Sequence, residues 1–262
     1  MNFSISQMPD RAAKPRATGL TMVMDKGLSL RETEDFIDGN KPFVDIVKLG
    51  FGSAVITPRL GEKLKLFAEA GIPVYFGGTL LEAFLIRNDF KGYLNVIEKY
   101  NIKYAEISDG SISLSHDEKC SLIKRLKQHV TVISEVGSKE EGIIIHPNRW
   151  IEMMQKELEA GVWKVIAEAR ESGNVGIYRP NGKAHVMLIN KIVSKVPVEH
   201  IIWEAPIKSQ QVYLIKLFGA NVNLGNIAPT EVIALETLRL GLRSDTFFQF
   251  IKEENVEITS IA

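Results

Sequence analysis

Several apolar runs in this sequence end abruptly in charged or amide side chains. The stretch KVIAEARESG, residues 164–173, passes from an apolar run into Glu168, Arg170 and Glu171. One such change would indicate only the start of a solvated loop, but its recurrence at nearly regular intervals favours one shared site. The residues at these run ends include Asp25, Lys48, Glu106, Glu135, Lys139, Glu168, Arg170, Glu204, Lys208 and Asn226.

Four of these residues are glutamates, and their number restricts the chemistry. Carboxylates held close together in a low dielectric repel one another strongly, so they need cations nearby. Lysine and arginine side chains can serve, and so can a divalent metal. Oxygen ligands without histidine or cysteine favour Mg²⁺ over zinc. Because Mg²⁺ usually takes only one or two carboxylates, not all four glutamates need be ligands.

Catalysis by a serine or cysteine nucleophile is not indicated. The sequence shows no legible Ser-His-Asp or Cys-His arrangement. The five histidines stand in expected helices or loops, or, for His200, at the beginning of an expected strand. Cys120 lies in a helical pattern and is expected to be a small buried residue. Catalysis is therefore expected to depend on lysines and carboxylates.

Hydrophobic patterning indicates the elements that must position these groups. Amphipathic patterns, with apolar residues at i, i+3, i+4 and i+7, predict helices at 58–71, 116–128, 148–161 and 229–241. Short apolar or β-branched runs between the helical patterns predict strands. These runs lie at 18–25, 44–51, 73–78, 103–108, 130–137, 163–169, 200–205 and 221–227.

Strands that alternate with amphipathic helices predict parallel β–α units. Eight such units in about 240 residues match the size of a (β/α)8 barrel. We therefore expect an α/β protein, a single-domain (β/α)8 TIM barrel at residues 18–262 preceded by a polar N-terminal arm at residues 1–17. The alternative, an open doubly wound sheet, usually carries a phosphate-binding loop after its first strand. Neither a GxGxxG nor a Walker A pattern is present here.

In a (β/α)8 barrel, residues at the carboxyl ends of the strands face one shared pocket. The four glutamates follow four consecutive strands, so we expect them to share that pocket with Lys48, Lys139 and Arg170. Glu135 and Glu168 stand on adjacent strands. We predict that these two glutamates hold one Mg²⁺ ion.

The remaining acids are expected to support the site. Glu106 and Glu204 are predicted to pair with Lys48 and Lys208 and to orient them, and Asp25 is predicted to assist. A structural ion pair across strands would also explain Lys48 beside Glu106, because barrel interiors often hold such pairs. The sequence leaves both interpretations open.

Composition excludes several classes of protein. The 262 residues carry 32 basic and 32 acidic side chains, so no global positive field favours nucleic acid or an acidic membrane. A single cysteine excludes an internal disulfide and a cysteine-cluster metal site. The N-terminus lacks the apolar core of a signal peptide, and no apolar run is long enough to span a membrane. We expect a cytoplasmic protein.

The strand ends also carry a more specific signal. Across Gly19 to Phe248 they resemble the phosphosulfolactate synthase family, through the motifs KLGFGSA, FGGTL, EISDG, SEVGSK, EARESG, EAPIKSQQ, NVNLGNIA and ALETLRLGLRSDTF. The resemblance implies a (β/α)8 barrel that catalyses Mg²⁺-dependent addition of sulfite to phosphoenolpyruvate, giving (2R)-phospho-3-sulfolactate. Family precedent also favours a homo-oligomer.

The resemblance, together with location, suggests roles for individual residues. Lys139, in SEVGSK, becomes the candidate proton donor. Phosphate is often bound after strands seven and eight of such barrels, here in APIKSQQ and GNIAPT. The residues expected to bind substrate are Lys48, Arg170, Ser172, Gly173, Lys208 and Asn226.

Two alternatives remain open at this point. The same pocket could serve another reaction of an enolate, such as an aldol addition or isomerisation, because metal, carboxylates and lysine would suit it equally. The family also includes a plant heat-stress-associated branch, so the barrel could be a noncatalytic stress-associated protein. Retained charges at costly polar positions argue against the second alternative.

Overall fold

The computed structural model describes residues 2–3, 5–137 and 146–251. Each of its strands lies within one of the predicted apolar runs. The strands are β1 (Thr21–Asp25), β2 (Ile46–Leu49), β3 (Val74–Phe76), β4 (Tyr104–Ile107), β5 (Thr131–Val136), β6 (Lys164–Ala167), β7 (Ile201–Glu204) and β8 (Leu224–Ile227).

The helices lie between and after these strands. They are α1 (Leu30–Asn40), α2 (Leu60–Glu69), α3 (Gly78–Leu85), α4 (Phe90–Lys99), α5 (His116–Leu126), α6 (Pro147–Ala160), α7 (Val186–Val193), α8 (Lys208–Phe218) and α9 (Val232–Arg239). Within the described ranges, none of them is long and apolar enough to cross a membrane.

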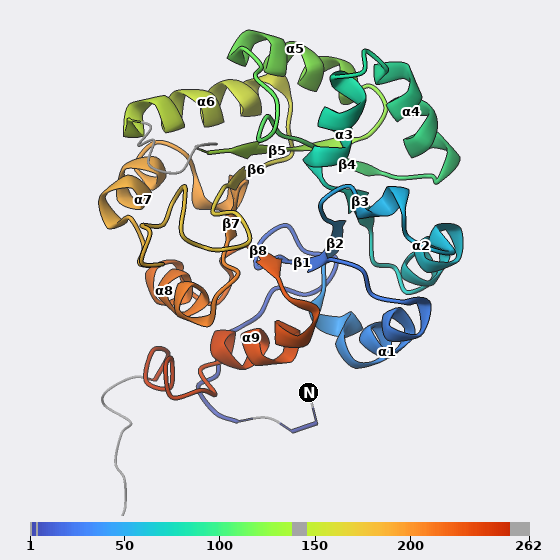
Figure 1. Cartoon of the computed structure of the whole chain (residues 1–262). Coiled ribbons are helices and arrows are strands. Elements are labelled where there is room, and N and C mark those ends of the chain that lie inside the picture. The colour runs from blue at the N-terminus through green and yellow to red at the C-terminus, as the bar shows by residue number, and fades with distance from the viewer. Residues whose placement is uncertain (1, 4, 138–145, 252–262) are drawn as a thin grey trace, which may run out of the picture.

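The strands form one parallel sheet in the order β3-β2-β1-β8-β7-β6-β5-β4. This order curls into a nearly closed barrel with the helices outside it, which confirms the predicted fold (Figure 1). β3 and β4 stand at the two ends of the order, so a seam without ladder hydrogen bonds separates them in the part of the chain that is described.

Two apolar cores explain why the strands read as almost unbroken apolar runs. One face of each strand packs against the helices, while the other face fills the barrel interior. The interior cluster consists of Met22, Ile46, Tyr75, Ile133, Ile166 and Ile202, each at most 2% exposed. Both faces are therefore buried, and a charged side chain can be accommodated only where a strand reaches the end of the barrel.

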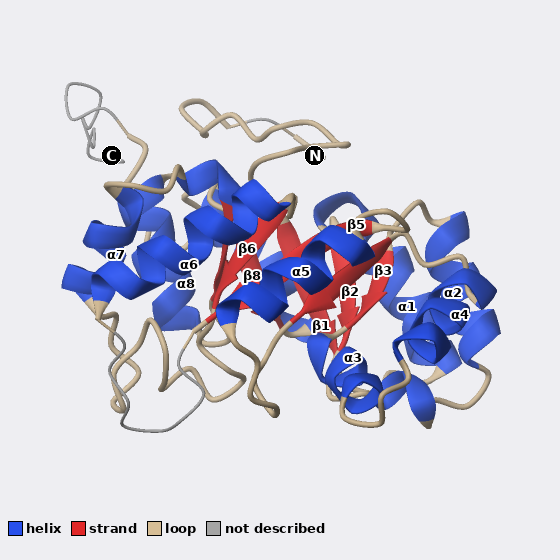
Figure 2. Ribbon diagram, turned by 90° about the horizontal axis from the view of Figure 1, so that it is seen from above, coloured by secondary structure: helices blue, strands red, loops and turns tan. Residues whose placement is uncertain are grey.

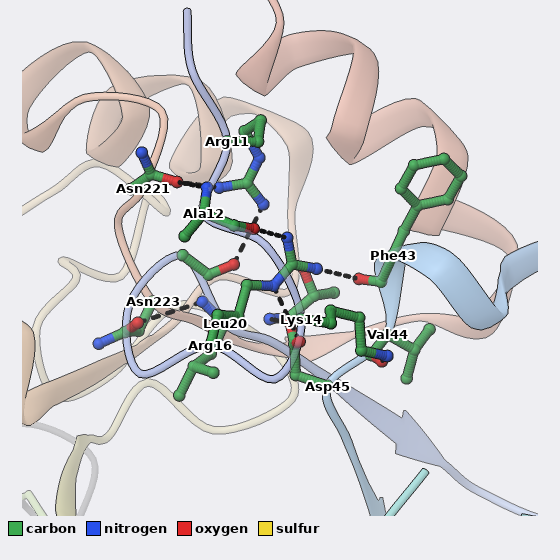
Figure 3. Close-up of polar contacts among 12 residues, drawn as sticks. Arg11, Ala12, Lys14, Arg16, Leu20, Phe43, Val44, Asp45, Asn221 and Asn223 are labelled. Atoms are coloured by element: carbon green, nitrogen blue, oxygen red, sulfur yellow. Dashed lines mark hydrogen bonds and ion pairs between the residues drawn. The ribbon is translucent and has the colours of Figure 1, made fainter. Parts of the chain in front are cut away.

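The N-terminal arm lies across one end of the barrel, opposite α3 (Figure 2). Arg11 donates hydrogen bonds to Glu236 (Nε to Oε1, 2.8 Å) and to the carbonyl oxygens of Ala220 (3.0 Å) and Gly19 (3.1 Å). Arg16 pairs with Asp45 (2.8 Å), and these contacts converge on the amino ends of the strands (Figure 3). The arm thus supplies cations to main-chain oxygens that the sheet leaves unpaired.

These contacts predict that the arm stabilises the barrel. Arg11→Ala removes one partner of an ion pair whose side chains are only 10% and 7% exposed. We expect the free energy of unfolding to fall by about 2–4 kcal/mol, because Glu236 loses its cation in a buried setting. Denaturant titration measures this change.

The matched control is Arg59→Ala. Arg59 also pairs with a glutamate, Glu62, but these side chains are 61% and 56% exposed. Exposed pairs contribute little, so this variant should unfold like the wild type. Equal stability of the two variants would contradict the anchoring role of the arm.

Candidate active site

A cavity of about 710 Å³ lies at the carboxyl ends of the strands. The structure brings most of the predicted site residues to its wall. Those on the lining are Lys48, Glu106, Glu135, Glu168, Arg170, Ser172, Glu204 and Asn226. The convergence expected from the strand ends is thus confirmed for all four glutamates.

Lys48, in β2, is the electrostatic centre of this cavity. Its Nζ lies 2.9 Å from Glu106, 3.6 Å from Glu135 and 3.9 Å from Glu204. Burial by itself would lower the pKa of Lys48, but the three carboxylates outweigh burial and raise the pKa above its usual range. Lys48 therefore remains charged and offsets part of the repulsion among the acids.

Glu106 is fixed by donors from the neighbouring strand and helix. Its Oε2 accepts from the Tyr75 hydroxyl (3.0 Å), and its Oε1 accepts from the backbone N–H of Gly78 (2.7 Å). Together with Lys48, these donors provide a partner for each carboxylate oxygen. Glu106 is therefore well placed to hold Lys48.

Glu204 is held in a similar way at the end of β7. Its Oε2 accepts from the backbone N–H of Ala169 (2.8 Å), and the Asn226 side chain forms a second hydrogen bond. Burial raises the pKa of Glu204, while Lys48 and the Ala169 N–H act in the opposite direction. This glutamate also has fixed partners before any ligand binds.

Glu135 and Glu168 have fewer fixed partners among the described residues. In the described part of the chain, the nearest cation to Glu135 is Lys48 at 3.6 Å, and Glu168 meets Arg170 at 3.4 Å. Burial raises the pKa of Glu135 well above its usual range despite Lys48. Burial, reinforced by Glu204, also raises the pKa of Glu168 to about 7. Both carboxyls would gain from an additional cation.

This donor set fits Mg²⁺ rather than a metal held by protein ligands alone. The described residues contain no group of three or more His, Cys, Asp or Glu side chains arranged to hold a metal. Mg²⁺ usually binds one or two protein carboxylates and keeps waters or substrate oxygens as its other ligands. Glu135 and Glu168, whose charge is only partly balanced by cations, match this pattern. Gly137 leaves room for the Glu168 side chain, because a Cβ there would lie 2.2 Å from Glu168 Oε2.

The predicted pair between Glu204 and Lys208 is wrong. Lys208 is the first residue of α8, and its Nζ pairs with Asp245 at 2.7 Å. Its side chain is 45% exposed and is not on the cavity lining. Glu204 instead uses Lys48, Ala169 and Asn226.

Two other predicted residues, Asp25 and Gly173, are not on the cavity lining. Asp25 accepts from the N–H groups of Gly27 and Leu28 and pairs with Lys63, so it supports the loop after β1. Gly173 uses its carbonyl oxygen to accept from Gln210 (2.7 Å). Lys139 lies outside the described residues.

Phe51 and Glu82 are among the lining residues that the sequence did not predict. Phe51 follows β2 in a left-handed backbone conformation, with φ of 56°. Glu82 lies within α3, an element that the strand-end pattern did not include. The signal for Glu82 was a single carboxylate in the otherwise apolar helix GTLLEAFL.

The sequence of this chain matches a known protein family. The sequence model described as (2R)-phospho-3-sulfolactate synthase (ComA) matches residues 9–245, a span that contains all four glutamates. The chain belongs to this phosphosulfolactate synthase family. Its resemblance to the family, proposed from the strand-end motifs, is confirmed.

Individual members of the phosphosulfolactate synthase family align over almost their full length. The phosphosulfolactate synthase of Bacillus subtilis (strain 168) is 38% identical over 251 residues, covering 95% of this chain and 100% of that protein. The one from Methanocaldococcus jannaschii is 41% identical over 237 residues, covering 87% and 94%.

Solved structures support the fold alone. 3-Hexulose-6-phosphate synthase from Salmonella typhimurium superposes with a TM-score of 0.55 at 14% identity, covering 86% of this chain and 100% of that one. Phosphoenolpyruvate phosphomutase from Streptomyces platensis subsp. rosaceus gives 0.51 at 13% identity, covering 82% and 78%.

The raised pKa of Glu168 predicts a pH dependence of stability in metal-free protein. The folded state keeps a proton that the unfolded chain releases between pH 4.5 and about 7, so the free energy of unfolding falls as pH rises through this window. A shift of this size corresponds to at most about 3 kcal/mol. Glu168→Gln should make this fall in the free energy of unfolding smaller. It should not abolish the fall, because the pKa of Glu135 is raised as well.

Denaturant unfolding in chelator at about pH 5 and pH 8 measures the effect. The control is Glu171→Gln, which changes an acid of the same loop that is 48% exposed and paired with Lys26. This control should keep the wild-type dependence. A Glu168→Gln protein with an unchanged dependence would show that Glu168 is not the titrating group.

Proposed function

We propose that the protein is a phosphosulfolactate synthase, which adds sulfite to phosphoenolpyruvate and forms (2R)-phospho-3-sulfolactate. The observation that carries this proposal is the intact ring of strand-end glutamates around Lys48, inside the span that matches the family. A cytoplasmic homo-oligomer acting on small molecules is part of the proposal, and light scattering tests the oligomer.

The reaction forms one bond and transfers one proton. The sulfur lone pair of sulfite forms a C–S bond to the methylene carbon of phosphoenolpyruvate. The electrons of the C=C bond move towards the carbon that bears the carboxylate, and a proton is then added to that carbon. The phosphate ester stays intact. The difficulty lies in the extra negative charge that develops on the substrate carboxylate, so cations must be close to it.

Glu135 and Glu168 would hold Mg²⁺, since they are the two of the four glutamates with the fewest fixed partners among the described residues. When bound there, Mg²⁺ supplies a Lewis acid for the substrate carboxylate. Arg170, beside Glu168 on the cavity wall, faces the anionic substrate. Lys48 neutralises the ring and offers its charge to the substrate from β2.

The protein side chains divide the remaining work. Glu106 and Glu204 orient Lys48 through the ion pairs described above. Ser172 and Asn226, both on the lining, support binding of the phosphate. Lys139 is proposed as the proton donor on the strength of the family resemblance. The cavity geometry offers no support for Lys208 or Gly173 as substrate contacts.

The direct test follows phosphoenolpyruvate and a new phosphate ester by phosphorus NMR, with and without sulfite, Mg²⁺ and chelator. We expect conversion only when sulfite and Mg²⁺ are both present. Consumption of phosphoenolpyruvate without sulfite would favour another enolate reaction. No conversion under any condition would favour a noncatalytic barrel.

The division among the glutamates predicts different metal dependences. Glu168→Gln should raise the Mg²⁺ concentration needed for half-maximal activity about tenfold or more, because a neutral amide is a poorer ligand. Glu204→Gln should leave that concentration unchanged even if turnover falls, because Glu204 faces Lys48. Titration of activity with Mg²⁺ measures both values. Identical metal dependence would leave the ring as a salt-bridge network only.

The proton-donor role predicts a selective loss in Lys139→Met. Turnover should disappear, while phosphoenolpyruvate binds nearly as well as to the wild type. Lys48→Met is the comparison, because it should also lose substrate affinity. General acid catalysis is worth about 10²–10⁴-fold. Retention of more than about a tenth of wild-type turnover would therefore exclude Lys139 as the sole acid.

A further inference from the structure

The seam between β3 and β4 borders the cavity, because Glu82 and Glu106, on its two sides, both line the cavity. Side chains take the place of ladder hydrogen bonds there. Tyr75 in β3 and Gly78 at the start of α3 both donate to Glu106 in β4. One carboxylate of β4 thus receives two donors from the other side of the seam.

A second carboxylate crosses the seam in the opposite direction. Glu82 belongs to α3, on the β3 side, and its Oε1 accepts from the Ser108 hydroxyl and from the N–H of Gly110 (3.1 Å). Its Oε2 accepts from the N–H groups of Ser111 (2.5 Å) and Ile112 (3.1 Å). All four donors belong to residues 108–112, which follow β4 and are called the β4 loop below.

Burying the carboxylate of Glu82 at this position costs free energy. It is only 2% exposed, and no ion pair to it is found among the described residues. A buried carboxylate without a cation is tolerated only when hydrogen bonds stabilise its charge. An apolar side chain would suit the rest of α3 better, so the value of Glu82 must lie in what it does to the β4 loop.

The β4 loop forms one wall of the cavity. Ser108, Gly110 and Ser111 line the cavity, as does Glu82 itself. α3 approaches this loop so closely that a Cβ on Gly78 would lie 2.0 Å from Ser108 Oγ. The wall therefore has its present shape only while α3 and the β4 loop stay together.

We infer that Glu82 is a positioning residue that fastens the β4 loop across the seam and so shapes the substrate cavity. Glu106 accepts hydrogen bonds from the β3 side of the seam, and Glu82 accepts hydrogen bonds from the β4 side. The two sides are thus joined at two points. The effect on substrate affinity rests on the proposed function, whereas the fastening of the loop does not.

Glu82→Gln is the principal variant. The amide keeps the shape of the side chain but turns an –NH₂ group towards backbone N–H donors, which lose their acceptor. Amide hydrogen exchange of Gly110, Ser111 and Ile112 should become at least about tenfold faster. Affinity for phosphoenolpyruvate, measured by calorimetry with Mg²⁺ and without sulfite, should fall about tenfold, and KM should rise in parallel.

Two further variants separate positioning from general destabilisation. Glu236→Gln weakens the buried ion pair with Arg11 at the opposite end of the barrel. This variant should lower stability without changing KM or hydrogen exchange in the β4 loop. Ser108→Ala removes one donor to Glu82 and is the milder change. Its effect on KM should largely disappear in the double variant with Glu82→Gln, since the two residues act through one contact.

The outcomes are distinct. A folded Glu82→Gln protein with exchange and affinity within about twofold of the wild type would overturn the inference. Faster exchange with unchanged affinity would also overturn it, because the loop would then not shape the cavity. If the wild type fails to bind phosphoenolpyruvate, the proposed function fails, and hydrogen exchange alone decides whether Glu82 fastens the loop.

Discussion

The charge balance around Lys48 is the constraint on which the rest of the site depends. Two unit charges 4 Å apart interact by about 4 kcal/mol at an effective dielectric of 20, so four neighbouring carboxylates cannot all ionise without cations. Lys48 lies within 3.9 Å of three of them, which offsets only part of the repulsion. Burial, reinforced by the neighbouring glutamates, raises the pKa values of Glu135 and Glu168. The fold thus leaves a deficit of positive charge at one defined place.

The two ends of the barrel handle charge in opposite ways. At the amino end, cations satisfy main-chain oxygens: the guanidinium of Arg239 donates to the carbonyls of Ala220, Val222 and Leu20, and Arg11 closes the same region. Burial lowers the pKa of Arg239 to about 9, yet each of these bonds contributes to the fold. At the carboxyl end, acids remain short of cations. Such an arrangement stabilises the fold less, and it is the one suited to capture a metal and an anionic substrate.

The sequence predicted the barrel and the meeting of the strand-end side chains, because period and turn signals determine which residues stand at strand ends. It could not predict the direction in which each side chain turns. Asp25 ends β1 as Glu106 nearly ends β4, but Asp25 turns to Lys63 and to two N–H groups of its own loop. Lys208 opens α8 and pairs with Asp245, a contact between distant segments that no local pattern encodes. Glu82 was missed because it acts from a helix.

Backbone donors explain why four identical side chains acquire different roles. Glu106 receives the N–H of Gly78, which follows β3, and Glu204 receives the N–H of Ala169, which follows β6. Glu135 and Glu168 receive no such N–H among the described residues, and these are the two acids to which we assign Mg²⁺ in the proposed function. A carboxylate that is already satisfied orients its neighbours, and an unsatisfied one recruits a ligand. Main-chain geometry, and not residue type, therefore separates the glutamates that accept a backbone N–H from those that do not in the described part of the chain.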